Sequence, residues 1–104
     1  MTVFVDDAFV SGDWGRWSGG GHLQAETLEE LHEMASRLGR ERSRFQSKPG
    51  RPWHDHYDLT RAGRERAIAL GAQAIGWRDT ARRNRAARHA HRDAAPGEAD
   101  RCER

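Results

Sequence analysis

The segment 53–60 (WHDHYDLT) carries more potentially reactive side chains than any other part of this 104-residue chain. If it is extended, its side chains alternate between two faces, so that His54, His56 and Asp58 share one face. Two imidazoles and a carboxylate spaced in this way could ligate a metal such as zinc or manganese. They could equally form a His–Asp acid/base pair.

The same segment also allows a structural interpretation. The alternating positions Tyr57 and Leu59 suit a hydrophobic core, and Thr60 can cap a helix that begins at residue 61. Asp58 would then be an ordinary acid at a helix entry, where the positive end of the helix dipole favours a carboxylate. Both interpretations stay open at this point.

A second polar group follows the apolar run 2–5, which predicts a strand. Sites in parallel α/β sheets lie just beyond the carboxyl ends of strands, where Asp6 and Asp7 would stand. Paired carboxylates there could hold Mg²⁺ against a phosphate, or they could simply end the strand and begin a turn. His22, after the glycine triplet 19–21, is either a site residue or a polar group at the start of a strand.

The elements that must position these residues can be predicted from local patterns. Apolar runs favour strands at 2–5, 22–25 and 72–77. A Thr-Leu-Glu-Glu capping box and helical apolar spacing predict a helix over 28–38, and a second helix is expected over 61–70. We therefore expect an α/β fold: a small two-layer domain over residues 1–77, with a short sheet covered by two helices.

The rest of the chain, residues 78–104, is predicted to be an Arg-rich tail, partly helical and then disordered. It holds eight Arg and five acidic residues, whereas residues 1–77 hold ten Lys or Arg and eleven acidic residues. The tail could contact the phosphate backbone of a nucleic acid, and the candidate contacts are Arg82, Arg83, Arg85 and Arg88. A solvated helical tail is the alternative, because Arg and Ala both favour helix.

The composition also suggests a location. No apolar run approaches the ~20 residues that span a bilayer, so we expect no membrane contact. The single cysteine, Cys102, cannot form an internal disulfide, which fits a reducing compartment. A cytoplasmic protein is expected.

Several motifs together resemble a family of short bacterial and phage proteins, domain-of-unknown-function family four thousand and thirty-one. The matching stretches are Val3-Phe4-Val5-Asp6-Asp7, His22-Leu23, Ala25-Glu26-Thr27, Leu28 to His32, Leu38-Gly39, Phe45-Gln46, His56-Tyr57-Asp58-Leu59-Thr60, Arg66-Ala67 and Leu70-Gly71-Ala72. The resemblance covers residues 2–77 and carries no established activity. It directs attention to the polar positions Asp6, Asp7, His22, His56, Tyr57 and Asp58.

The chain departs from the family at two positions and leaves two candidates outside the match. The family tends to have a bulkier residue where this chain has Gly21, and a tryptophan where it has Arg44. His54 and Asp55 lie outside the matching motifs.

Two functions remain open. The preferred one is a non-catalytic binding module for nucleic acid or a protein partner. The alternative is a metal-assisted phosphoester or nucleotide hydrolase that uses Mg²⁺, Mn²⁺ or Zn²⁺, with Asp6, Asp7 and Asp58 as ligands. In the hydrolase, His22 or His56 would be a ligand or the general acid/base. Catalysis requires these side chains to converge in a concave site, whereas a binding module would scatter them.

Overall fold

The computed structural model describes residues 2–94 and contains one four-stranded mixed sheet. The strands stand in the order β3 (Tyr57–Leu59), β2 (Gly21–Ala25), β1 (Val3–Val5) and β4 (Gln73–Ala74). β2 is antiparallel to both β1 and β3, and β4 is parallel to β1. The predicted α/β class is confirmed, and β1 is an interior strand of the sheet.

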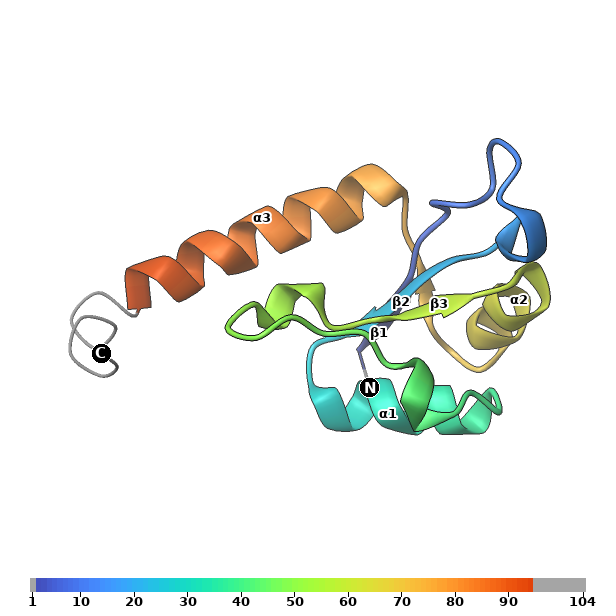
Figure 1. Cartoon of the computed structure of the whole chain (residues 1–104), viewed down its shortest axis with the longest axis horizontal. Coiled ribbons are helices and arrows are strands. Elements are labelled where there is room, and N and C mark those ends of the chain that lie inside the picture. The colour runs from blue at the N-terminus through green and yellow to red at the C-terminus, as the bar shows by residue number, and fades with distance from the viewer. Residues whose placement is uncertain (1, 95–104) are drawn as a thin grey trace.

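Three α-helices accompany the sheet: α1 (Leu28–Arg37), α2 (Arg61–Ala69) and α3 (Trp77–Ala94). Figure 1 shows α1 and α2 on one side of the sheet and α3 on the other. Three short 3₁₀ turns, at Gly15–Trp17, Arg42–Arg44 and Pro52–His54, lie in the connections.

The predicted caps fix the starts of α1 and α2. The hydroxyl of Thr27 accepts a hydrogen bond from the Glu30 amide at 3.2 Å, and the hydroxyl of Thr60 accepts one from the Gly63 amide at 3.2 Å. Each hydroxyl satisfies an amide that has no partner within the first helical turn. The two helices on one face of the sheet are therefore confirmed.

The hydrophobic core lies between the sheet and these two helices. Alternation along β1 and β3 sends every second side chain into it, so that Tyr57 is 1% exposed and Leu59 is 0% exposed. The other fully buried members are Val3, Val5, Leu23, Leu31, Met34, Ala35 and Ala67. The opposite face of the same strands carries Phe4 and Asp58.

The strand expected over 72–77 is shorter than predicted. β4 pairs with β1 only at Gln73 and Ala74, and α3 already begins at Trp77. The backbone amide of Trp77 donates to Oδ1 of Asp7 at 2.8 Å, which satisfies an amide at the helix N-terminus and places a negative charge there. This contact links the end of β1 to the start of α3.

α3 forms a partial third layer that the sequence did not reveal, because the helix has no apolar stripe. Its contacts to the sheet are polar. Oδ1 of Asn84 accepts a hydrogen bond from Gln24 Nε2 at 3.2 Å, and the Arg83 guanidinium lies 3.8 Å from the centre of the Phe4 ring. Thr80 is buried in the same layer.

The tail is helical as far as Ala94. The rest of it, residues 95–104 with Cys102, lies outside the described residues, and so does the disorder predicted there. Within residues 2–94, no helix has the length and apolar character needed to cross a bilayer.

Candidate metal centre

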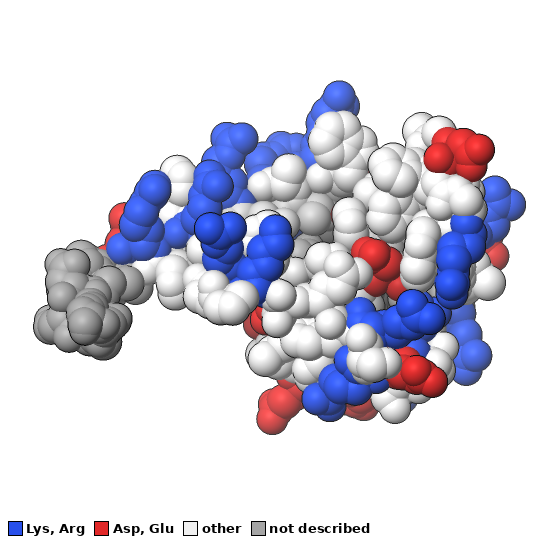
Figure 2. Space-filling view, in the orientation of Figure 1, with Lys and Arg blue, Asp and Glu red and all other residues white. Residues whose placement is uncertain are grey.

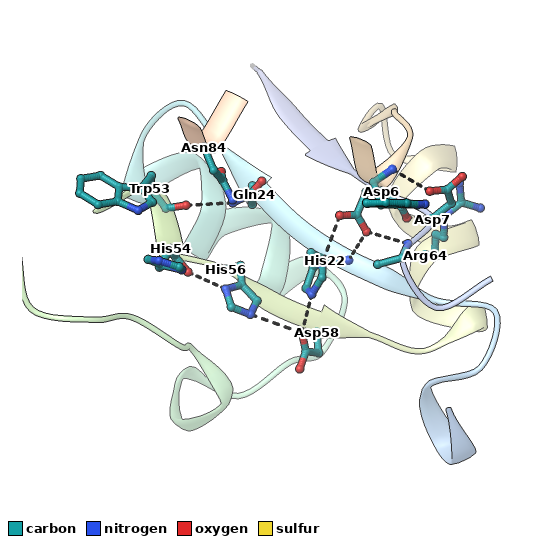
Figure 3. A network of polar contacts seen from close by, with 12 residues as sticks. Asp6, Asp7, His22, Gln24, Trp53, His54, His56, Asp58, Arg64 and Asn84 are labelled. Atoms are coloured by element: carbon teal, nitrogen blue, oxygen red, sulfur yellow. Dashed lines mark hydrogen bonds and ion pairs between the residues drawn. The ribbon is translucent and has the colours of Figure 1, made fainter. Parts of the chain in front are cut away.

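The register of three neighbouring strands aligns three of the candidate residues. His22 on β2 stands directly opposite Asp58 on β3. On the other side of β2, Asp6 follows β1 and its amide donates to the His22 carbonyl at 3.1 Å. Because directly opposite residues of a sheet point to the same face, the side chains of Asp6, His22 and Asp58 form one row on the face opposite the core (Figure 3).

His56, the residue just before β3, joins this row. It precedes Asp58 by two residues and therefore shares its face, as predicted from the alternation. Nε2 of His56 lies 3.4 Å from Oδ1 of Asp58, and Nε2 of His22 lies 3.9 Å from the same oxygen. One ligand atom from each of His22, His56 and Asp58 lies within 4.8 Å of the other two.

Both histidines direct the same ring nitrogen toward Asp58, because the other nitrogen is already engaged. Nδ1 of His22 lies 2.9 Å from Oδ2 of Asp6, and Nδ1 of His56 contacts the carbonyl oxygen of His54. A carboxylate and a carbonyl can only accept, so Nδ1 carries the proton in both rings. In the neutral tautomers, both Nε2 atoms therefore present lone pairs to the oxygen of Asp58.

That oxygen is itself incompletely satisfied. Oδ1 of Asp58 is buried and accepts no hydrogen bond from residues 2–94, whereas Oδ2 accepts one from Gln46 Nε2 at 2.8 Å. The 3.4 Å separation from His56 is longer than a charge-assisted hydrogen bond of about 2.7–2.9 Å. Nε2 of His22, Nε2 of His56 and Oδ1 of Asp58 thus converge on one point, where a metal ion could be held or where a proton on His56 Nε2 could face the carboxylate.

The charges of the row are coupled. Burial alone would lower the pKa of His56, but the facing Asp58 carboxylate and the His54 carbonyl outweigh it and raise that pKa above its usual value. The interaction with His56 in turn lowers the pKa of Asp58, although its burial opposes this. Burial of Asp6 would raise its pKa, but hydrogen bonds from the ring and backbone of His22 outweigh it and lower the pKa. Both carboxylates are thus held ionised near neutral pH.

The grouping differs from the predicted one in three respects. Asp6 lies behind His22 rather than beside Asp58, and its carboxylate contacts Nδ1 of the His22 ring. Asp7 lies outside the cluster, where its Oδ1 accepts the amide of Trp77. His54, considered first as a ligand, belongs to a 3₁₀ turn instead of the extended segment and contributes its carbonyl group.

Two glycines allow the strands to approach one another at this site. A Cβ atom on Gly21 would lie 2.0 Å from the carbonyl oxygen of Asp6, and one on Gly20 would lie 1.8 Å from that of Leu59. Both separations are far shorter than any van der Waals contact. The end of the glycine triplet therefore serves close backbone packing beside His22.

Cavities border the cluster on two sides. One, of about 410 Å³, is lined by Asp6 and His22 together with residues of α3. Another, of about 500 Å³, is lined by Gln46, His54 and His56. A larger cavity of about 550 Å³ lies between α3 and the start of α1 and contains none of the three ligand residues. The cluster is therefore open to small molecules from either side.

The four arginines predicted to contact nucleic acid fall into two groups. Arg82 pairs with Asp79 at 2.9 Å, and Arg83 covers the Phe4 ring. Arg85 and Arg88 are exposed and line a cavity of about 260 Å³ next to the sheet.

The family model described as protein of unknown function (DUF4031) matches residues 3–87. The chain belongs to this family. The resemblance drawn from the motifs is thus confirmed, and the matched region extends into α3, beyond the residue at which the compact domain was predicted to end. The comparison with curated proteins and the comparison with solved structures gave no significant match.

All residues of the row lie within the part matched by the DUF4031 family, as does Gln46, which the sequence alone did not single out. The signal for Gln46 was weak because the segment around it is too short to predict a strand. It forms an isolated antiparallel bridge with His56, which brings its amide to Asp58. Gly21, noted above as a departure from the family, is required by the backbone packing against Asp6 in this chain.

Proposed function

We propose that this protein is a metal-dependent phosphoester hydrolase whose metal ion is held by His22, His56 and Asp58. The observation that carries the proposal is the approach of two Nε2 atoms to one buried carboxylate oxygen that accepts no hydrogen bond from residues 2–94. This convergence is the property that separates a hydrolase from a non-catalytic binding module in the alternatives drawn from the sequence. We therefore favour the hydrolase.

The surroundings of the three ligands support this assignment. Each ligand has a partner that fixes its orientation: the Asp6 carboxylate for His22, the His54 carbonyl for His56 and the Gln46 amide for Asp58. Partners of this kind set the tautomer of a ligating imidazole and raise its basicity. Ion pairs on a protein surface have no comparable need for three oriented partners.

The donor set favours zinc or manganese over magnesium. Magnesium prefers oxygen ligands in octahedral geometry, whereas two imidazoles and one carboxylate suit zinc and related transition metals. Ligand atoms of a tetrahedral zinc site lie about 3.4 Å apart. The separation of 3.4 Å between His56 Nε2 and Asp58 Oδ1 already matches this geometry, and the other ligand atoms, which all lie within 4.8 Å of one another, would have to move closer.

Three protein ligands leave a position for water, as in catalytic zinc sites. A metal ion bound there would lower the pKa of that water toward neutrality and polarise a phosphoryl oxygen. The protein contributes the orientation of the two imidazoles, the negative charges of Asp6 and Asp58, and adjacent cavities in which a phosphoester can be placed.

The proposal is tested by calorimetric titration of the full chain with Zn²⁺ and Mn²⁺. We expect one saturable site in the wild type, and its loss in His22→Ala, His56→Ala and Asp58→Asn. His89→Ala is the matched control, because His89 is exposed on α3 and belongs to no part of the cluster. Hydrolysis of bis(p-nitrophenyl) phosphate by the metal-loaded protein then tests the reaction.

Two results would contradict the proposal at different levels. Equal metal binding by the wild type and the Asp58→Asn variant would remove the metal site itself. Metal binding by the wild type, with hydrolysis no faster than that of the metal-free protein, would keep the site but remove the hydrolase function.

A further inference from the structure

Two exposed tryptophans line the cavity that reaches His22. The cavity has a volume of about 410 Å³, which lies within the ~300–1,000 Å³ range of small-molecule sites. Its lining includes Trp14 from the loop after β1 and Trp77 from the start of α3. It also includes His22 and Asp6, which belong to the row of Asp6, His22, His56 and Asp58 that we call the metal row. Trp14 is 49% exposed and Trp77 is 50% exposed. Side chains of this size are usually covered, so their shared exposure at one cavity calls for a ligand.

Trp14 is held in place although it is exposed. Its Nε1 donates to the Ser11 carbonyl at 2.7 Å, and its backbone amide donates to Ser18 Oγ at 2.8 Å. Its ring packs on Phe9 with centroids 5.1 Å apart, and Phe9 packs on His22 at the same separation. An aromatic surface fixed in this way can receive a flat ligand without a large loss of side-chain entropy.

Trp77 is anchored by its backbone. Its amide donates to Oδ1 of Asp7, which fixes the first residue of α3 beside the end of β1. The Arg78 guanidinium lies 4.8 Å from the ring centre of Trp77. The two tryptophans therefore come from separate elements, and each is positioned by contacts that do not involve the cavity.

The cavity continues along α3 into a positively charged region. Ala81 and Asn84 line both this cavity and the neighbouring one, of about 260 Å³, whose lining also includes Trp53, His54, Arg85 and Arg88. Figure 2 shows basic side chains along α3, which carries six Arg and two Asp. The two cavities thus form a path from an aromatic pair, past the metal row, to two exposed guanidinium groups.

We propose that this path binds single-stranded nucleic acid, with a nucleobase stacked at Trp14 and Trp77 and the phosphate backbone beside Arg85 and Arg88. Aromatic rings accept any nucleobase by stacking, and Arg neutralises the backbone; together they form the usual surface for single strands. The strand would pass His22, so a backbone phosphoester lies at the metal row. This inference rests on the proposed hydrolase for its chemistry, but the binding itself needs no metal.

The test measures the fluorescence anisotropy of labelled oligo(dT) with the full chain in EDTA. Loss of a stacked base costs about 1–3 kcal/mol, which is about a 5- to 150-fold loss of affinity. We expect Trp14→Ala and Trp77→Ala each to weaken binding within this range, and Trp14→Phe to restore most of it. Arg85→Ala and Arg88→Ala should each reduce the slope of log affinity against log salt by about one.

Matched controls lie close to each of these positions. Trp17→Ala removes an aromatic ring of the same loop that does not line the cavity, and Arg82→Ala removes an arginine that is paired with Asp79. Circular dichroism checks that each variant is folded. A titration with thymidine monophosphate distinguishes a free nucleotide from a strand, and equal affinity for both would assign the site to the nucleotide.

Several outcomes would overturn the inference. The first is that neither oligo(dT) nor thymidine monophosphate binds. The second is that Trp14→Ala and Trp17→Ala lose equal affinity for oligo(dT). The third is that only the arginine variants lose affinity. None of them affects the metal titration, so a failure of this inference can be separated from a failure of the proposed hydrolase.

Discussion

Nδ1 of His22 lies 2.9 Å from Oδ2 of Asp6, a carboxylate that is only 1% exposed. The other oxygen of the same carboxylate accepts the backbone amides of His22 at 2.8 Å and of Ala8 at 3.0 Å. Asp6 therefore fixes both the tautomer and the position of His22, and it leaves Nε2 of the ring directed toward Asp58.

Asp6→Asn should weaken metal binding without removing a ligand. The amide can no longer hold the proton of His22 on Nδ1 with the same strength, and changes of this kind cost about 10–100-fold in metal affinity. The free energy of unfolding should also fall by about 1–3 kcal/mol, because buried hydrogen bonds are lost or reversed. Calorimetric titration with Zn²⁺ and urea unfolding measure the two effects. Unchanged zinc affinity in a folded variant would show that Asp6 does not orient a ligand.

The pH dependence should differ between the metal-free and the metal-bound protein. Asp58 raises the pKa of His56 above the ordinary value of 6.5. This pair therefore stabilises the metal-free fold below pH 6.5, and the contribution is lost as pH rises through the raised pKa. Metal binding requires neutral His56, so the metal affinity should rise over the same range.

Thermal unfolding between about pH 5.5 and pH 8, with and without Zn²⁺, tests whether the metal-free stability and the metal affinity depend on pH in opposite directions. The increase in Tm on adding zinc should grow with pH in the wild type. It should be small at every pH in His56→Gln, which keeps a polar side chain of similar reach. A zinc-induced increase that is largest at pH 5.5 would contradict the assignment of His56 as a ligand.

Gly21→Ala should disrupt the approach of β2 to the end of β1. The added Cβ would lie 2.0 Å from the Asp6 carbonyl oxygen, so the backbone that carries the metal row must shift. Overpacking of this kind costs about 1–3 kcal/mol of stability, and the zinc affinity should fall with it. Gly63→Ala in α2 is the matched control, because its added Cβ would lie 3.5 Å from Leu59 Cβ, which is an ordinary contact. That change should stabilise the protein by up to about 1 kcal/mol through helix propensity. Equal unfolding midpoints for the two variants in urea would contradict the packing argument.

Local patterns were sufficient to predict part of the site. The alternation of side chains in a strand depends only on sequence position, so His56 and Asp58 could be placed on one face and Tyr57 in the core. The caps at Thr27 and Thr60 likewise act within four residues. These features follow from short-range geometry, which a sequence displays directly.

The remaining parts depend on contacts between distant segments. His22 meets Asp58 because of the register between β2 and β3, and no pattern within either strand specifies that register. The third layer was missed for a different reason: α3 docks through Asn84 and Arg83, and a hydrogen bond or a cation–π contact leaves no periodic apolar signal. Polar docking of this kind can be recognised only once the partner surface is known.

Asp6 and Asp7 are adjacent in the sequence, yet they should have separate effects. The carboxylate of Asp7 accepts the amide of Trp77 at the start of α3, so Asp7→Ala should cost about 1 kcal/mol of stability, as for the loss of a helix cap. It should also loosen Trp77 and weaken oligo(dT) binding several-fold, while zinc affinity stays within twofold of the wild type. Asp7→Asn keeps an acceptor oxygen and should behave almost as the wild type in all three measurements. A large loss of zinc affinity in Asp7→Ala, comparable to that in Asp6→Asn, would instead make Asp7 a member of the metal centre.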